Sequence, residues 1–86
     1  MSDMPNISHI YEQKGVVVYL RARNLLSQYQ KVKHYLLQGN KLQVTFKQRN
    51  PKGSGVWYFR INRQFRALCV FNDEGDLIVF QIDNHQ

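Results

Sequence analysis

The sequence has little cysteine and no long apolar run. Cys69 is the single cysteine among 86 residues, which excludes an intramolecular disulfide and a cysteine-rich zinc site and fits a reducing, cytoplasmic setting. It lies in an apolar strand pattern, so we expect a small core residue. The longest early apolar run, Val16–Leu20, is far too short to span a bilayer and lacks the cleavage pattern of a secretory signal. We therefore expect no membrane partner and no export.

Acidic residues are missing from the whole middle of the chain. All twelve Lys and Arg residues fall between Lys14 and Arg66, and this span contains no Asp or Glu. The six acids lie outside it, at Asp3, Glu12, Asp73, Glu74, Asp76 and Asp83. A segment of one charge sign creates a positive field that suits a nucleic acid or an acidic protein segment. The alternative is a basic surface that only keeps the protein in solution.

Residue patterns typical of metal sites and of serine nucleophiles are missing as well. The three histidines are scattered and the acids are not paired at ligand spacing. No serine nucleophile motif occurs. An enzyme built on this sequence would work without a metal, and we expect no cofactor.

The apolar content, 43% of the residues, is ordinary for a packed domain. A chain of this length forms one domain, residues 1–86. Its first half predicts a strand over Ile7–Gln13 and a short helix within Lys14–Arg23. From Leu25, apolar residues recur at steps of three and four, which predicts a longer helix that stops at Gly39–Asn40.

The second half predicts strands. Lys41–Lys47 alternates with period two, and Gln48–Gly55 collects turn-forming residues. Gly55–Phe71 predicts two strands joined by a tight polar turn, and Asn72–Asp76 predicts a second turn. Leu77–Ile82 is nearly all apolar, so we expect it to lie centrally and to be covered on both faces. Helices followed by an antiparallel meander predict an α+β fold of four to five strands.

Two arginines flank the turn of the predicted hairpin. Arg60 and Arg66 flank a connection of four to five residues, so their Cα atoms should lie on adjacent strands and both side chains can converge on one point. Arg63 is expected to face solvent within the turn. Arginine forks bind phosphate bidentately and stabilise charge that develops on a phosphoryl group. The alternative is that they only pair across the sheet with an acid, at Asp73, Asp76 or Asp83.

The end of the last strand adds two candidates, Asp83 and His85. We expect nearby arginines to keep His85 neutral near pH 7, which suits a general base. Asp83 shares its side of the strand and can orient the ring or hold an arginine. The alternative is that His85 is simply exposed.

Further cations and one aromatic ring are candidates for RNA binding. Lys47, Arg49 and Lys52 lie on or near the loop that leads into the hairpin. Tyr58, on the outer face of its strand, is a better candidate for base stacking than Trp57, whose position fits core packing.

The segments Gly55–Arg66 and Ile82–His85 resemble the RelE/ParE superfamily of bacterial toxins, and most closely its HigB-type toxins. The shared features are a tryptophan strand that runs into Arg-Ile-Asn, then Gln-aromatic-Arg, and an Asp-x-His near the end. Here they correspond to 57–62, 64–66 and 83–85. The resemblance covers roughly Lys41 to His85, about half of the chain.

The resemblance implies a RelE-like fold, with two N-terminal helices packed on a curved antiparallel sheet and an active site in its basic concave face. Those toxins of this kind that are RNases cut mRNA in the ribosomal A site without a metal, the 2′-hydroxyl attacking the adjacent phosphate to leave a cyclic phosphate. By resemblance, Arg66 stabilises the crowded phosphorane and Arg60 positions the phosphate. His85 with Asp83 supplies or organises proton transfer. Asn84 replaces the aromatic residue of the family pattern, and the resemblance supplies no general acid.

Three functions follow as expectations. The first is a ribosome-dependent, metal-independent mRNA endonuclease that inhibits translation as the toxin of a type II toxin–antitoxin pair. The others are a ParE-like inhibitor that binds DNA gyrase without nuclease activity and a non-catalytic RNA-binding relative. For the first, the expected partners are mRNA on the ribosome and a cognate antitoxin with an acidic or amphipathic segment.

Overall fold

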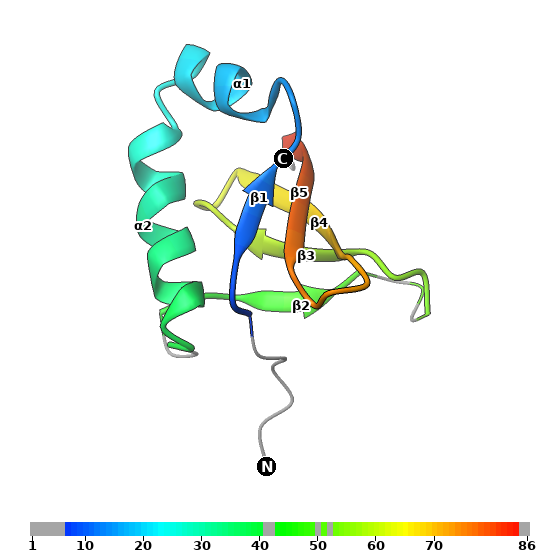
Figure 1. Ribbon diagram of the computed structural model, residues 1–86. Coiled ribbons are helices and arrows are strands. Elements are labelled where there is room, and N and C mark those ends of the chain that lie inside the picture. Colours follow the sequence, from blue (N-terminus) through cyan, green and yellow to red (C-terminus); the bar gives the residue numbers. More distant parts are fainter. Residues whose placement is uncertain (1–6, 41–42, 50, 52, 85–86) are drawn as a thin grey trace.

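The structure is a computed structural model, and it describes residues 7–40, 43–49, 51 and 53–84. Along this part of the chain, one strand is followed by two helices and then by four strands (Figure 1). Their bounds are β1 Ile10–Glu12, α1 Val16–Ala22, α2 Leu26–Leu37, β2 Phe46–Gln48, β3 Trp57–Arg60, β4 Phe65–Phe71 and β5 Leu77–Asn84. Both predicted helices and the predicted hairpin are therefore present.

The strands form one sheet in the order β1-β5-β4-β3-β2. Its neighbours from β2 to β5 pair antiparallel, whereas β1 pairs parallel with β5. The helices carry the chain from one edge of the sheet to the other, so the last strand returns beside the first and runs in the same direction (Figure 1). The predicted α+β fold, with two helices packed on a sheet, is confirmed, but the sheet is mixed and not antiparallel throughout as predicted, because β1 pairs parallel with β5.

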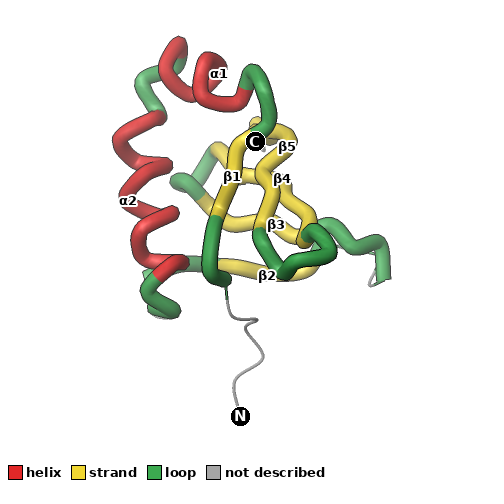
Figure 2. The backbone as a smooth tube through the Cα atoms, viewed as in Figure 1, coloured by secondary structure: helices red, strands yellow, loops and turns green. Residues whose placement is uncertain are grey.

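The helices share one core with one face of the sheet (Figure 2). Leu20 of α1 and Tyr29 of α2 are fully enclosed together with Phe59 of β3 and Val79 of β5. In an antiparallel pair, directly opposed residues lie on the same face. The side chains that alternate with the core residues therefore point to the other face, which we call the open face because no described helix covers it.

Two strand predictions are corrected. Residues 77–82 do not form the central strand, because β4 occupies the centre and β5 is second from the edge. Nor are they covered on both faces, since Ile78 and Phe80 are half-buried and Gln81 is exposed. The strand predicted over Lys41–Lys47 begins only at Phe46 in the structure. The first two residues of the predicted range lie outside the described part of the chain. Residues 43–45 are not strand, although the backbone N–H of Arg60 still donates to the carbonyl of Thr45 at 3.3 Å.

A carboxylate of the edge strand holds α2 in place. Tyr29 Oη donates to Glu12 Oε2 at 2.7 Å, and Lys33 Nζ donates to the same oxygen at 2.7 Å. Burial, and then the bond to Glu12, raise the pKa of Tyr29 far above its ordinary value, so the hydroxyl stays protonated as the donor. Lys33 thus contacts the edge strand, and its side chain is 27% exposed.

We expect Tyr29→Phe to lower the free energy of unfolding by about 1.5–3 kcal/mol, because it removes a hydrogen bond to a charged acceptor. Tyr35→Phe, in the same helix, is the control, since no described group bonds the Tyr35 hydroxyl. It should change stability by less than about 0.5 kcal/mol. Denaturant titrations measure both values, and equal losses in the two variants would contradict this role of Tyr29.

Candidate functional site

The open face carries a row of three charged residues across three strands. Arg60 of β3 is the register partner of Arg66 of β4, and Arg66 is the partner of Asp83 of β5. We call this set the arginine row. Directly opposed residues of antiparallel strands have Cβ atoms roughly 5 Å apart, so the predicted placement of the two arginines on adjacent strands is confirmed.

A second row runs beside the first, two residues away from it on β3, β4 and β5, and extends onto β2. It consists of register partners on four strands, and we call it the tyrosine row: Lys47, Tyr58, Leu68 and Gln81. Residues two apart on a strand lie roughly 7 Å from each other on one face. The two rows therefore form one patch of cationic, aromatic and amide groups around the buried side chain of Leu68.

Arg66 is held from two sides. Its Nη2 donates to Asp83 Oδ2 at 2.9 Å, and its guanidinium carbon lies 4.8 Å from the centre of the Tyr58 ring. The Arg66 side chain is 16% exposed, so these contacts act where water screens them little. The pairing with Asp83 matches the alternative raised from the sequence, and Asp83 thus holds an arginine. The enclosed Nε of Arg66 has no acceptor among the described residues.

Arg60 is the opposite case. It is exposed and forms no ion pair with any acid in the described part of the chain. Like charges on directly opposed positions destabilise a pair of strands. An anion between Arg60 and Arg66 would relieve this repulsion, so the geometry favours an anionic ligand at the arginine row.

Side-chain amides fix the turn between the two arginines. Asn62 Oδ1 accepts the backbone N–H groups of Gln64 at 2.8 Å and of Phe65 at 2.9 Å. Asn62 Nδ2 donates to Gln28 of α2 at 2.9 Å, and Gln64 Nε2 donates to Asn84 of β5 at 3.0 Å. The turn is thereby tied to a helix and to the last strand. Sequence reasoning missed these residues, although an asparagine two positions before a turn amide is a known signal.

The remaining predicted residues divide into two groups. Lys47 is exposed beside Tyr58 and joins the patch, while Arg63 faces solvent as predicted. Arg49 is exposed beyond the end of β2, where its backbone N–H donates to the carbonyl of Val56 at 2.7 Å, so it lies further from the arginine row. Lys52 and His85 lie outside the described residues.

Trp57 belongs to the core side of the sheet. Its ring stacks on Phe46 with centroids 5.0 Å apart and meets Phe71 edge-on at 5.7 Å. The packing interpretation of Trp57 is thus confirmed. Tyr58, which points to the open face, is partly covered by Arg66, so only part of its ring is free to meet a ligand.

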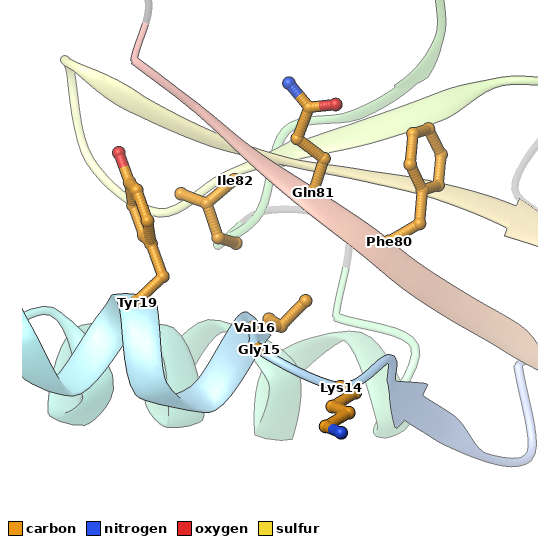
Figure 3. Close-up of a pocket in the computed structure, with 7 residues that line it drawn as sticks. All are labelled: Lys14, Gly15, Val16, Tyr19, Phe80, Gln81 and Ile82. Atoms are coloured by element: carbon orange, nitrogen blue, oxygen red, sulfur yellow. The ribbon is translucent and has the colours of Figure 1, made fainter.

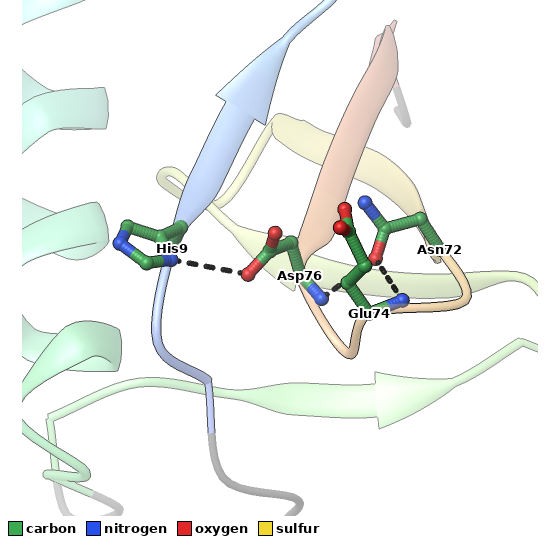
Figure 4. Close-up of polar contacts among 4 residues, drawn as sticks. All are labelled: His9, Asn72, Glu74 and Asp76. Carbon is green, nitrogen blue, oxygen red and sulfur yellow. Dashed lines mark hydrogen bonds and ion pairs between the residues drawn. The ribbon is translucent and has the colours of Figure 1, made fainter.

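A second polar cluster lies at the other end of β5 (Figure 4). His9 Nδ1 and Asp76 Oδ1 are 3.1 Å apart, and Asn72 Oδ1 accepts the backbone N–H groups of Glu74 and Asp76 at 2.9 Å each. These contacts close the β4–β5 turn and tie it to the residue before β1. The cluster is remote from Asp83 along the strand, so it serves the fold and not the arginine row.

No family model matches this chain, and no curated protein matches it. Within the described ranges, no group of three or more His, Cys, Asp or Glu side chains is placed to hold a metal ion. No helix in the same part of the chain has the length and apolar character needed to cross a membrane. The patch on the open face is therefore the feature of the described residues that bears on function.

Cys69 is fully buried in β4, as predicted for a core residue, and burial raises the pKa of its thiol to about 12. The thiolate is the reactive form, so the native protein should resist alkylation at about pH 8.5 and react rapidly once unfolded in denaturant. Because the unfolded thiol has the lower pKa, ionisation of Cys69 should also reduce stability as pH rises above about 9. Mass spectrometry after timed exposure to iodoacetamide measures the reactivity. Equal rates with and without denaturant would contradict the burial.

Proposed function

We propose that this chain is the toxin of a type II toxin–antitoxin pair and cuts mRNA on the ribosome. The observation that supports this most directly is the arginine row, which opposes an exposed Arg60 to a fixed Arg66 on the helix-free face. The resemblance of residues 55–66 and 82–85 to RelE/ParE toxins gives the row its chemistry. A cytoplasmic location belongs to the same proposal.

The two arginines suit different tasks. Arg60 is exposed and unpaired among the described acids, so it can reach out to the incoming phosphate and position it. Arg66 is already oriented by Asp83 and Tyr58 and still has N–H donors besides the one given to Asp83. A preoriented cation stabilises charge that develops on a phosphorane without having to reorganise.

The reaction needs a base that takes a proton from the 2′-hydroxyl and an acid that gives a proton to the 5′-oxygen. The 2′-hydroxyl loses its proton and attacks the adjacent phosphorus, the bond to the 5′-oxygen breaks, and that oxygen takes up a proton. The products are a cyclic phosphate and a 5′-hydroxyl end. We assign the base to His85 from the resemblance. Asp83 is engaged with Arg66, so we assign it a positioning role and not proton transfer.

Substitutions in the row test this proposal. Arg60→Ala and Arg66→Ala should each reduce mRNA cleavage on ribosomes by about 10²–10³-fold, because each removes stabilisation of the transition state. Induced expression of either variant should then no longer arrest growth. Arg63→Ala is the matched control, since Arg63 is an exposed arginine in the same hairpin outside the row, and it should arrest growth as the unchanged chain does.

Primer extension on a reporter mRNA measures cleavage, and growth curves measure toxicity. Undiminished cleavage by both row variants would show that the arginines do not perform this chemistry. Growth arrest with intact mRNA and a loss of gyrase supercoiling would instead favour a ParE-like inhibitor.

One observation favours a non-catalytic RNA-binding protein as the second candidate. Arg66 Nη2 already donates a hydrogen bond to Asp83, so this donor is engaged within the protein. In that case affinity for single-stranded RNA should fall with salt by a log–log slope of about 0.7 per phosphate contact. Arg60→Ala should reduce the slope by about one contact without any cleavage to lose. Anisotropy titrations over a range of salt concentrations measure the slope, and binding insensitive to salt would exclude this candidate.

A further inference from the structure

A pocket opens where β1 and β5 part. The parallel pairing ends at Glu12 opposite Val79, and the last bond runs from Gln13 N to the carbonyl of Val79 at 2.9 Å. Gly15, with φ 95°, then turns the chain into α1, while β5 continues to Asn84. The pocket, about 320 Å³ in volume, lies between α1 and this further part of β5 (Figure 3). This volume lies at the lower end of the range of ligand sites.

An irregularity in β5 shapes the wall of the pocket. Leu68 pairs with Gln81 but Cys69 pairs with Val79, so Phe80 is an extra residue in β5. Successive residues of a regular strand point to opposite faces, whereas a bulge re-aims a side chain. The side chains of Phe80 and Gln81 accordingly leave β5 on the same side (Figure 3). An aromatic ring and an amide are thus presented together.

The remaining lining comes from α1 and the residue before it. Tyr19 and Val16 supply apolar surface opposite Ile82, and Lys14 lines the pocket with its amine directed away from the other side chains (Figure 3). Aromatic rings together with an amide are groups by which proteins bind nucleobases, since the rings stack on the base and the amide bonds its edge.

The charge around the pocket favours a ligand that carries phosphate. The guanidinium carbon of Arg23 lies 3.6 Å from the centre of the Tyr19 ring, which backs the ring with a cation. Lys14 and Arg23 form no ion pair with an acid of the described residues, and no acid lines the pocket. A purely apolar ligand would make no use of these charges.

The pocket is continuous with the site already described. Gln81 lies at the end of the tyrosine row, and Asp83 of the arginine row follows two residues later on the same strand. The two Cα atoms are therefore roughly 7 Å apart, about the span of one nucleotide. A base in the pocket would belong to the nucleotide next to a phosphate held by Arg60 and Arg66.

We propose that the pocket between α1 and β5 is a nucleobase subsite for the RNA nucleotide adjacent to the phosphate at the arginine row. The inference rests on the proposed function, because RNA is the ligand of both. It adds a second contact point that selects for a base and not only for charge.

Binding to RNA that lacks one base tests the subsite. The probe is a fluorescent single strand of about six nucleotides, with 2′-O-methyl sugars so that it cannot be cut, compared with a set in which each position in turn is abasic. The phosphates are the same throughout. The unchanged protein should bind the strand with one particular abasic position about tenfold more weakly, because it loses stacking in the pocket.

Pocket variants should lose this discrimination. Gln81→Ala and Tyr19→Leu should bind the intact strand about as weakly as the abasic one. Tyr11→Leu is the control, since Tyr11 is an exposed tyrosine of β1 that does not line the pocket, and it should keep the tenfold difference. Thermal unfolding establishes that each variant is folded. Gln81 is exposed, so its variant decides the matter if Tyr19→Leu does not fold.

The subsite is overturned if the unchanged protein is indifferent to every abasic position, or if the folded pocket variants keep the discrimination. A failure of the arginine row is seen separately. Arg60→Ala should weaken binding to the intact and abasic strands by the same factor. If it weakens neither while the pocket variants lose discrimination, the arginine row is wrong and the subsite stands.

Discussion

The register between β3 and β4 is the constraint on which the rest of the site depends. Phe59 and Ala67 are register partners with no exposed surface, so the core fixes their side of the sheet. A slip by one residue would turn these apolar side chains outward and drive Arg60 and Arg66 into the core. The bonds of Asn62 within the turn and to Gln28 hold the same register from the end of the hairpin. Packing on the helix side thus decides where the cations of the open face lie.

Electrostatics then allows the two arginines to remain opposed. Asp83 neutralises Arg66 at 2.9 Å and leaves Arg60 as the exposed charge of the row. Removing Asp83 would leave two guanidinium groups on register partners with no counter-charge from β5, which costs stability. The carboxylate therefore makes the opposition of two arginines compatible with a stable strand pair. In a chain whose middle fifty residues or so lack any acid, it has to come from the last strand.

The parts of the fold that the sequence predicts are those set by local patterns. The three- and four-residue steps after Leu25 predict α2, and period two with a polar turn predicts the opposition of Arg60 and Arg66. The parallel pairing of β1 with β5 joins residues more than sixty positions apart, and no local pattern encodes it. The contact of Lys33 with Glu12 cannot be predicted from the sequence for the same reason. A helix face exposed to solvent and a helix face that contacts an edge strand can have the same residue pattern.

The bulge at Phe80 explains why the site was only partly predictable. Leu77 and Val79 face the core, so strict alternation would place Gln81 and Asp83 there too and leave Ile82 outside. The extra residue reverses the phase: Ile82 is buried, and Asp83 reaches Arg66 on the open face. The bulge gives up regular pairing at one position. The same bulge directs the Asp83 carboxylate toward Arg66 and shapes the wall of the pocket between α1 and β5. Both parts of the proposed RNA site therefore depend on one departure from regular strand geometry.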